Sequence, residues 1–293
     1  MKNPIIEVKD LEYTYGNGKT ALNKINVNFY KGERVCVIGS NGAGKSTFFL
    51  NLNGVLKAKN GKILYNGQVI EKKNLNELRK NVGIVFQDAD SQIIASTVMA
   101  EVSFGPMNLK LPKEEVKSRV EMALNYMNIS DFKDRPPHYL SGGEKKRVSI
   151  ADIIAMKPEV IIFDEPTASL DPINSAVLEE VLSKLNEEGK TILVSTHDVN
   201  FVYRWAERVL VFSKGNIIFD GTPTEIFKNE EVVKAANLKK PILFDMYEVL
   251  VSKKSFYDYQ VKNGCGFVGE IDEEKWNLEK KIKIVKEIKI PDA

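Results

Sequence analysis

The chain has 293 residues, of which 43% are apolar and 28% are charged, as expected for a soluble globular protein with a hydrophobic core. Its 42 Lys and Arg and 40 Asp and Glu residues leave a net charge of +2, which gives no general electrostatic reason to expect a nucleic-acid partner. Residues 1–10 contain no apolar leader, and no stretch approaches about 18 uninterrupted apolar residues, so we expect neither a signal peptide nor a membrane span. The sequence therefore predicts a cytoplasmic protein that would work at a membrane only through a partner.

Only two cysteines are present, Cys36 and Cys265, which is too few for a disulfide framework. Cys36 lies inside the apolar run 35–38. We therefore interpret it as a small buried hydrophobe and not as a reactive thiol.

The first part of the chain reads as short strands that lead to a glycine-rich loop. Strands are expected at 5–8, 12–15 and 25–29, with a turn at 16–18, and the last strand has the period-two alternation of a half-buried antiparallel strand. A buried strand at 34–38 follows, and after the loop a helix is expected from about Lys45 to Leu52.

Two further buried strands, 160–163 and 191–195, each lie between helical patterns, which is typical of a parallel sheet covered on both faces. A helix-rich stretch at about 97–157 precedes them and contains an amphipathic helix at 113–127. The pattern weakens beyond Gly221, and the Lys- and Glu-rich tail from Glu270 suggests a small C-terminal extension. We predict an α/β fold with a domain at 1–240 and an extension at 241–293.

The loop between the strand at 34–38 and the following helix matches the phosphate-binding pattern G-x-x-x-x-G-K-[ST] in the structural context that this pattern requires. Glycines let successive backbone N–H groups turn inward, and with the helix N-terminus they form an anion site. Lys45 would reach the β- and γ-phosphates, Ser46 would ligate Mg²⁺, and Thr47 would lie near the α-phosphate. The predicted nucleotide-binding residues are Gly39, Ser40, Asn41, Gly42, Ala43, Gly44, Lys45, Ser46 and Thr47.

A second acidic site follows the strand at 160–163. Asp164 stands at the carboxyl end of this strand, where its carboxylate can hold Mg²⁺ beside the phosphate loop. Glu165 can orient or deprotonate an attacking water. A phosphate loop alone is shared by kinases, GTPases and transport ATPases, but this pair of acids favours hydrolysis of ATP.

The segment Leu140-Ser141-Gly142-Gly143-Glu144, followed by three basic residues, narrows the interpretation. Here the chain resembles the ABC ATPases, whose signature is this LSGG(Q/E) sequence, and the resemblance covers residues 1 to about 225. It implies a P-loop NTPase core with a mixed, mainly parallel sheet, an N-terminal antiparallel β subdomain and a helical subdomain at about 90–157. It further implies roles for four single residues, which are Gln87 in the Q-loop, Asp171 in the D-loop, His197 in the H-loop and Tyr15 under the adenine.

The signature adds a second anion-binding helix N-terminus at Ser141, Gly142 and Gly143, without a lysine of its own. In the family it completes the γ-phosphate site of a partner subunit, so that two chains enclose two Mg·ATP molecules. Glu165 would activate water, while His197 and Gln87 would position the γ-phosphate and Mg²⁺. Tyr13 lies on the same strand face as Tyr15, so either ring could stack on adenine.

Two classes of ABC protein remain to be separated, which are the energising subunit of a transporter and a soluble ATPase acting on DNA or ribosomes. About 100 residues separate Gly39 from Ser141 without sustained heptads, and the chain carries one cassette, so transport is the better interpretation. The other class is kept as the alternative function. His138 has no comparable setting and is interpreted as a loop residue.

Residues 85–94, 97–98 and 101–109 are similar to the ATPases of energy-coupling factor transporters, including the cobalt-uptake type, although Ala89 replaces the usual Pro. In that family the groove by the Q-loop receives arginines of a transmembrane protein, for which Asp88 and Asp90 are suitable acids. An acidic surface loop is an equally acceptable interpretation. The family's C-terminal extension contributes dimer contacts. Cobalt, nickel or a vitamin as substrate, and a homo- or heterodimer, are left open.

Overall fold

The computed structural model describes residues 3–168 and 170–251. The predicted tail from Glu270 and residues 252–293 of the predicted extension lie outside these residues. The chain divides into two compact units, Met1–Phe244 and Asp245–Ala293. Within the described ranges, no helix combines the length and the apolar character needed to cross a membrane.

The first unit begins with an antiparallel sheet in the order β2-β1-β4-β5. Its strands are β1 (Ile6–Thr14), β2 (Thr20–Phe29), β4 (Asn60–Tyr65) and β5 (Gln68–Val69). The sequence predicted two separate strands at 5–8 and 12–15, and this was wrong. They form one strand, which is interrupted by a bulge between Val8 and Leu11 where Asp10 adopts a φ of +46°. A bulge inserts an extra residue without ending the pairing.

A second sheet of six strands has the order β10-β9-β3-β8-β7-β6. Its members are β3 (Arg34–Gly39), β6 (Val82–Val85), β7 (Val160–Asp164), β8 (Thr191–Ser195), β9 (Arg208–Ser213) and β10 (Asn216–Gly221). All neighbours are parallel except β9 and β10, which are antiparallel. The predicted mixed, mainly parallel sheet is therefore confirmed.

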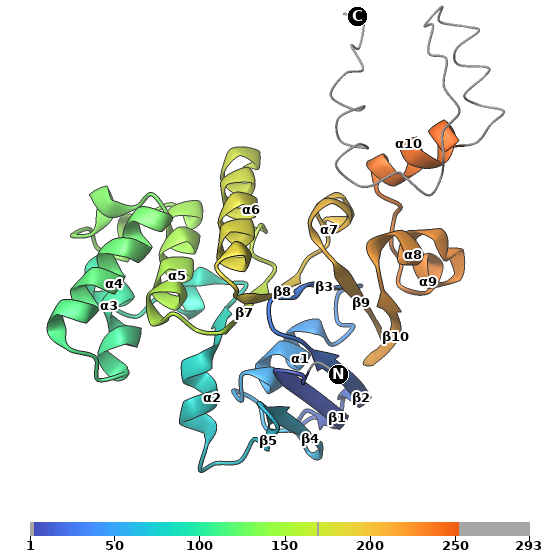
Figure 1. The fold of residues 1–293 in the computed structure, drawn as a ribbon, viewed down its shortest axis with the longest axis horizontal. Coiled ribbons are helices and arrows are strands. Elements are labelled where there is room, and N and C mark those ends of the chain that lie inside the picture. Colours follow the sequence, from blue (N-terminus) through green and yellow to red (C-terminus); the bar gives the residue numbers. More distant parts are fainter. Residues whose placement is uncertain (1–2, 169, 252–293) are drawn as a thin grey trace, which may run out of the picture. The chain divides into compact units, whose positions relative to one another are not determined.

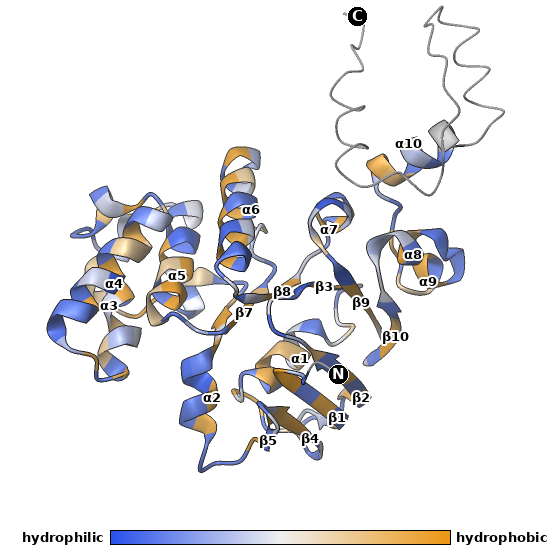
Figure 2. Cartoon of the chain, in the orientation of Figure 1, coloured by the Kyte–Doolittle hydropathy of each residue, from blue (hydrophilic) through white to orange (hydrophobic). Residues whose placement is uncertain are grey.

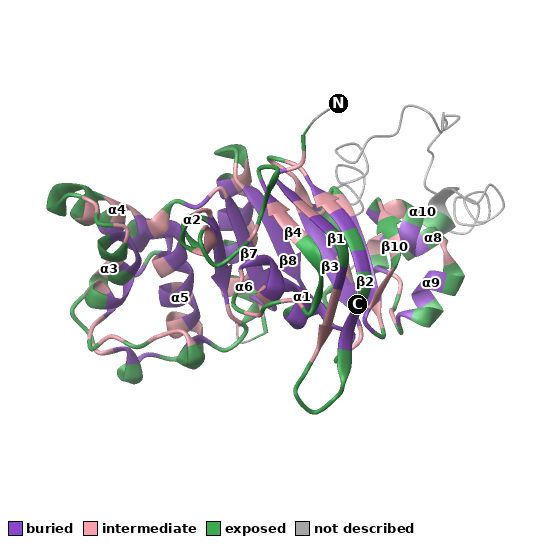
Figure 3. Ribbon diagram, turned by 90° about the horizontal axis from the view of Figure 1, so that it is seen from below, coloured by how far each residue is buried: buried purple, intermediate pink, exposed green. Residues whose placement is uncertain are grey.

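Both faces of the six-stranded sheet are buried except at the edge strand β10, as Figure 3 shows for β3, β7 and β8. Alternate side chains of each strand enter different cores, because successive residues of a strand point to opposite faces. Val160 and Ile162 of β7 join one core with Phe48 and Phe49 of α1 (Lys45–Leu52), together with apolar residues of the antiparallel sheet. Helix α1, which carries the phosphate loop at its N-terminus, thus packs against strands of both sheets.

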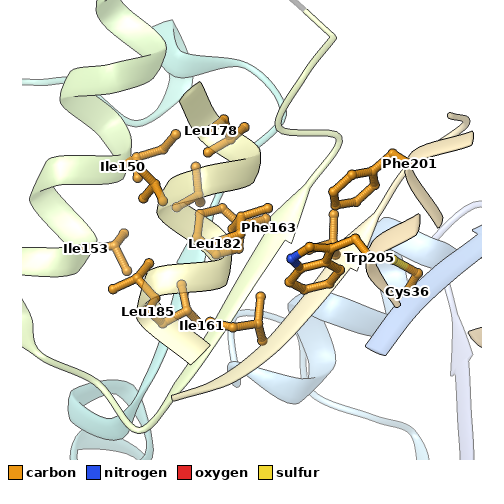
Figure 4. Close-up of a cluster of buried hydrophobic side chains, with 14 of the residues drawn as sticks. Cys36, Ile150, Ile153, Ile161, Phe163, Leu178, Leu182, Leu185, Phe201 and Trp205 are labelled. Carbon is orange, nitrogen blue, oxygen red and sulfur yellow. The ribbon is translucent and has the colours of Figure 1, made fainter. Parts of the chain in front are cut away.

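The opposite face packs against α5 (Gly142–Met156), α6 (Pro172–Glu187) and α7 (Val199–Trp205). Figure 4 shows side chains of α5 and α6 meeting Ile161 and Phe163 of β7, and Trp205 of α7 beside Cys36 and Phe201. Helix α6 is amphipathic, because its buried residues recur every three or four positions and so share one face. Hydrophobic and hydrophilic residues therefore alternate along the helix in Figure 2. Cys36 is buried as predicted, and burial raises the pKa of its thiol.

Helices α3 (Val98–Asn108), α4 (Lys113–Tyr126) and α5 form a group at one end of the sheet (Figure 1). The predicted helix at 113–127 corresponds to α4. The remaining helices are α2 (Leu75–Asn81), α8 (Pro223–Lys228), α9 (Glu230–Ala235) and α10 (Ile242–Val251), with single 3₁₀ turns at Ala89–Ser91, Ser130–Phe132 and Pro137–Tyr139.

Candidate nucleotide site

The phosphate loop connects β3 to α1, and two of its glycines are required by the geometry. Gly39 has a φ of +143° and Gly44 a φ of +111°, conformations that L side chains rarely adopt. A Cβ at Gly39 would collide with the carbonyl oxygen of Phe212, and a Cβ at Gly44 would lie 2.6 Å from that of Ala21. The loop backbone therefore packs directly against two other segments, which holds its shape.

Lys45, the first residue of α1, is almost fully buried under this loop. Its Nζ donates hydrogen bonds to the carbonyl oxygens of Gly39 at 2.8 Å and Ser40 at 3.4 Å. Burial lowers the pKa of Lys45, and the charges of Glu165 and Asp164 act in the opposite direction. Ser46, the next residue, is exposed.

Tyr15 lies directly after β1 and reaches the phosphate loop. Its hydroxyl is 2.8 Å from the hydroxyl of Thr47, and its ring is partly exposed. Tyr13 meets Tyr15 edge to face, with ring centroids 5.0 Å apart, and packs against the core of the antiparallel sheet. Of the two tyrosines, Tyr15 is the one that the structure places at the loop.

Asp164 ends β7 and is nearly buried. Its Oδ1 accepts a hydrogen bond of 2.5 Å from the hydroxyl of Ser195, at the end of the neighbouring strand β8. The same hydroxyl accepts a hydrogen bond from the backbone N–H of Glu165. Ser195 orients both acids, and sequence reasoning missed this role because a serine at the end of a strand carries no motif by itself.

Glu165 follows Asp164 with a φ of +46°, an uncommon conformation for a residue with a side chain. Its Oε1 lies 3.0 Å from Nε2 of His197 and 3.9 Å from Nζ of Lys45, and the latter two atoms are 3.4 Å apart. Burial raises the pKa of Glu165, while the charges of His197 and Lys45 oppose the rise. Three residues from distant parts of the sequence thus converge beside the phosphate loop. An uncommon backbone conformation such as that of Glu165 is typical of functional sites.

The signature forms a separate helix N-terminus. Ser141 caps α5, where its hydroxyl accepts from the backbone N–H of Glu144 and the carboxylate of Glu144 accepts from the backbone N–H of Ser141. Asp171 caps α6 in the same way through the N–H of Asn174. Both caps lie outside the cluster of ionisable side chains formed by Lys45, Glu165 and His197. The N–H groups of the first turn of α5 have no partner within that helix.

Comparisons with known proteins show the family of the chain. A family model described as ABC transporter matches residues 22–168. The chain belongs to the ABC transporter ATPases. An energy-coupling factor transporter ATP-binding protein, EcfA, of Methanocaldococcus jannaschii is 49% identical over 251 residues, which are 85% of this chain and 90% of that protein. EcfA of Methanococcus maripaludis is 45% identical and covers 95% of this chain and 99% of its own length.

Solved structures support the same assignment. CbiO1 of Clostridium perfringens, part of the ABC transporter complex CbiONQ, is 41% identical with a TM-score of 0.71, covering 85% of this chain and 100% of its own. A dimeric bacterial ABC transporter cassette is 31% identical with a TM-score of 0.69, covering 74% and 98%. This ABC ATPase therefore has the predicted P-loop NTPase fold, is related to the energy-coupling factor ATP-binding proteins, and binds and hydrolyses ATP.

Gln87 lies on the exposed loop after β6. The two acids of this loop, Asp88 and Asp90, both interact with other residues of the ABC ATPase. Asp90 pairs with Lys145 of α5 at 2.7 Å. Asp88 accepts hydrogen bonds from the N–H of Asp90 and the hydroxyl of Ser91, and these bonds lower its pKa. The two acids thus shape the loop. His138, in the turn Pro137–Tyr139, is exposed and stays a loop residue.

The residues predicted to hold Mg²⁺ supply oxygen donors only, which are the Ser46 hydroxyl, the Gln87 amide and the Asp164 carboxylate. Among the described residues of this ABC ATPase, no group of three or more His, Cys, Asp and Glu could hold a metal ion. Mg²⁺ is commonly held by one or two protein groups together with water and substrate phosphates, so this sparse oxygen set fits it.

Proposed function

We propose that this chain is the ATP-hydrolysing subunit of an energy-coupling factor importer, working as one of two ATPase subunits that enclose two ATP molecules. The proposal rests on two separate helix N-termini in the chain, each of which can bind an anion. One is the phosphate loop with Lys45, Glu165 and His197, and the other is the N-terminus of α5 at Ser141. The acid at the second site, Glu144, is engaged in the helix cap, and the two lysines that follow it contact the loop at Gln87. This site therefore suits a phosphate that another chain already holds.

At the phosphate loop we assign a role to each side chain. Lys45 binds the β- and γ-phosphates, because its ammonium is buried at the loop carbonyls. Glu165 accepts the proton of the attacking water, since burial raises its pKa and makes it a better base than an exposed carboxylate. His197, next to Glu165 and Lys45, donates to the γ-phosphate. Tyr15 stacks on the adenine, and Thr47 binds near the α-phosphate.

The residues Gly39 to Gly44 supply the amide cradle, and Gln87, Ser46 and Asp164 hold Mg²⁺. The ion would neutralise charge on the β- and γ-phosphates. Ser141, Gly142, Gly143 and Asp171 act on the nucleotide held by the partner chain. Electrostatic positioning of this kind supplies most of the rate in phosphoryl transfer.

Transport requires a membrane partner, for which the loop at Gln87 is the proposed docking region. The subunit would then be peripheral, at the cytoplasmic face of the cell membrane. The similarity of residues 85–109 to cobalt-uptake ATPases supports cobalt or another micronutrient as the substrate. We propose that residues 1–240 form the ATPase domain and that 241–293 contribute to dimer contacts.

The two-chain site is tested with Glu165→Gln. This variant should bind ATP normally, lose nearly all turnover, and form an ATP-dependent dimer, with itself or with a second ATPase subunit, that size-exclusion chromatography detects. Normal turnover would remove Glu165 from its role. Purification of the tagged chain from membranes, identification of the bound transmembrane subunits, and uptake of Co²⁺, Ni²⁺ or vitamins by vesicles would identify the substrate. A soluble pool bound to ribosomes or DNA would favour the alternative function.

A further inference from the structure

The loop that carries Gln87 is fastened to the signature helix α5 by several side chains. Lys145 pairs with Asp90 at the surface. Gln92 accepts from the backbone N–H of Phe86 at 3.3 Å and donates to the carbonyl oxygen of Ser149 at 2.8 Å. The most buried of these connections belongs to Lys146, which the proposed chemistry does not use.

Lys146 is 1% exposed, although lysine is almost never fully buried without partners. Its Nζ donates to the carbonyl oxygens of Phe86 at 2.6 Å and Gln87 at 3.1 Å. Burial lowers its pKa to about 8, so the ammonium remains mostly protonated at neutral pH and its hydrogen bonds are charge-assisted. This buried cation donates both of these hydrogen bonds to backbone oxygens and so fixes the position of the chain at Gln87.

The location of Lys146 gives this contact a consequence for hydrolysis. It lies about one and a half turns along α5 from Ser141, which caps that helix. In the two-chain site, Ser141 meets the nucleotide of the partner chain, whereas Gln87 acts on the nucleotide of its own chain. Lys146 therefore connects, within one chain, groups that serve two different ATP molecules.

We propose that Lys146 is a positioning residue for hydrolysis. It couples the position of Gln87, at the nucleotide of its own chain, to the position of the signature helix α5, at the nucleotide of the partner chain. The inference rests on the proposed two-chain site. Loss of the ammonium leaves two carbonyl oxygens without their donor and frees Gln87 from α5. ATP capture depends on the loop amides and the signature, and the Lys146 ammonium donates its hydrogen bonds to neither of them, so capture is expected to persist.

The test compares Lys146→Met, which has a similar length and no donor, with Lys146→Arg, which keeps a charged donor. Lys145→Met, one residue away and paired at the surface, is the matched control, because surface ion pairs contribute little. For Lys146→Met we expect kcat to fall about 10- to 100-fold with KM for ATP changed less than about twofold. Lys146→Arg should restore most of kcat, and Lys145→Met should match the wild type. Thermal unfolding and ATP binding by each purified full-length variant verify that it is folded.

A second measurement separates positioning from a structural role and from failure of the two-chain site. Combined with Glu165→Gln, Lys146→Met should still give the ATP-dependent dimer. The inference is overturned if Lys146→Met keeps the wild-type kcat, if Lys146→Arg is as inactive as Lys146→Met, or if the combined variant loses a dimer that Glu165→Gln alone forms. Absence of the dimer with Glu165→Gln alone overturns the proposed function instead, and this inference with it.

Discussion

Nε2 of His197 lies 3.0 Å from Oε1 of Glu165, and the two side chains come from the ends of adjacent parallel strands. Asp164, one residue before Glu165, pairs with Ser195, two residues before His197. The strand register therefore sets the distance between the proposed base and the proposed γ-phosphate ligand. Lys45 lies within 4 Å of both side chains, which brings the phosphate loop into the same cluster.

His197→Ala removes one donor from this cluster and leaves the phosphate loop unchanged. We expect kcat to fall about 100-fold while the Kd for ATP changes little, because a group that acts in the transition state contributes mainly to turnover. Steady-state ATPase assays and equilibrium nucleotide binding measure the two effects separately. A variant with unchanged kcat would assign His197 a structural role, and His138→Ala, in an exposed turn, is the control.

Tyr15 and Tyr13 are separated by their packing. Tyr15→Ala should raise KM for ATP about tenfold through loss of a stacking ring, whereas Tyr15→Phe, which loses only the hydrogen bond to Thr47, should raise it less than about threefold. Tyr13→Ala should lower the midpoint of thermal unfolding and leave KM for ATP nearly unchanged, because the Tyr13 ring packs against the core. The reverse pattern would place the adenine on Tyr13.

The glycines of the phosphate loop should differ in tolerance. Gly42 has a φ of +76° with open space around a Cβ, so Gly42→Ala should cost about 1 kcal/mol of stability. Gly39→Ala adds a collision with the Phe212 carbonyl and should cost on the order of 3 kcal/mol. Chemical denaturation of the two variants measures the difference, and equal losses would mean that the loop does not pack as described.

Much of this site follows from local sequence. The phosphate loop, Asp164 and Glu165 are predictable because their chemistry depends on residues a few positions apart, at the junction of a strand with a loop. Ser195 and Lys146 were not predicted to take part, because their contacts connect segments at least 30 residues apart and, for Lys146, end on backbone oxygens. The bulge at Asp10 was also missed, since an interrupted alternation in one strand resembles two short strands.

Asp152 of α5 gives a pH dependence of stability. Burial raises its pKa from about 4 to about 7, although Gln92 donates to its carboxylate at 3.2 Å. The folded state favours the protonated form of Asp152. The contribution of this group to the free energy of unfolding is therefore fully present below about pH 4 and is lost as the pH rises through 7. Asp152→Asn should therefore become progressively more stable than the wild type from pH 4 to 7, by on the order of 2 to 4 kcal/mol at the plateau.

Thermal or urea unfolding from pH 4 to 8.5 measures this difference. Asp131→Asn, at an exposed position, is the control and should show no such trend. A stability difference between Asp152→Asn and the wild type that does not change with pH would contradict the prediction.

In the proposed two-chain site, the signature acts on the nucleotide of another chain. Equilibrium binding of ATP to monomeric Ser141→Arg, compared with Lys45→Ala and with steady-state hydrolysis by the same proteins, tests it most directly. We predict that Ser141→Arg binds ATP within about twofold of the wild type while hydrolysis falls more than about 100-fold, and that Lys45→Ala loses binding itself. A loss of monomer binding by Ser141→Arg as large as that of Lys45→Ala would contradict the two-chain site.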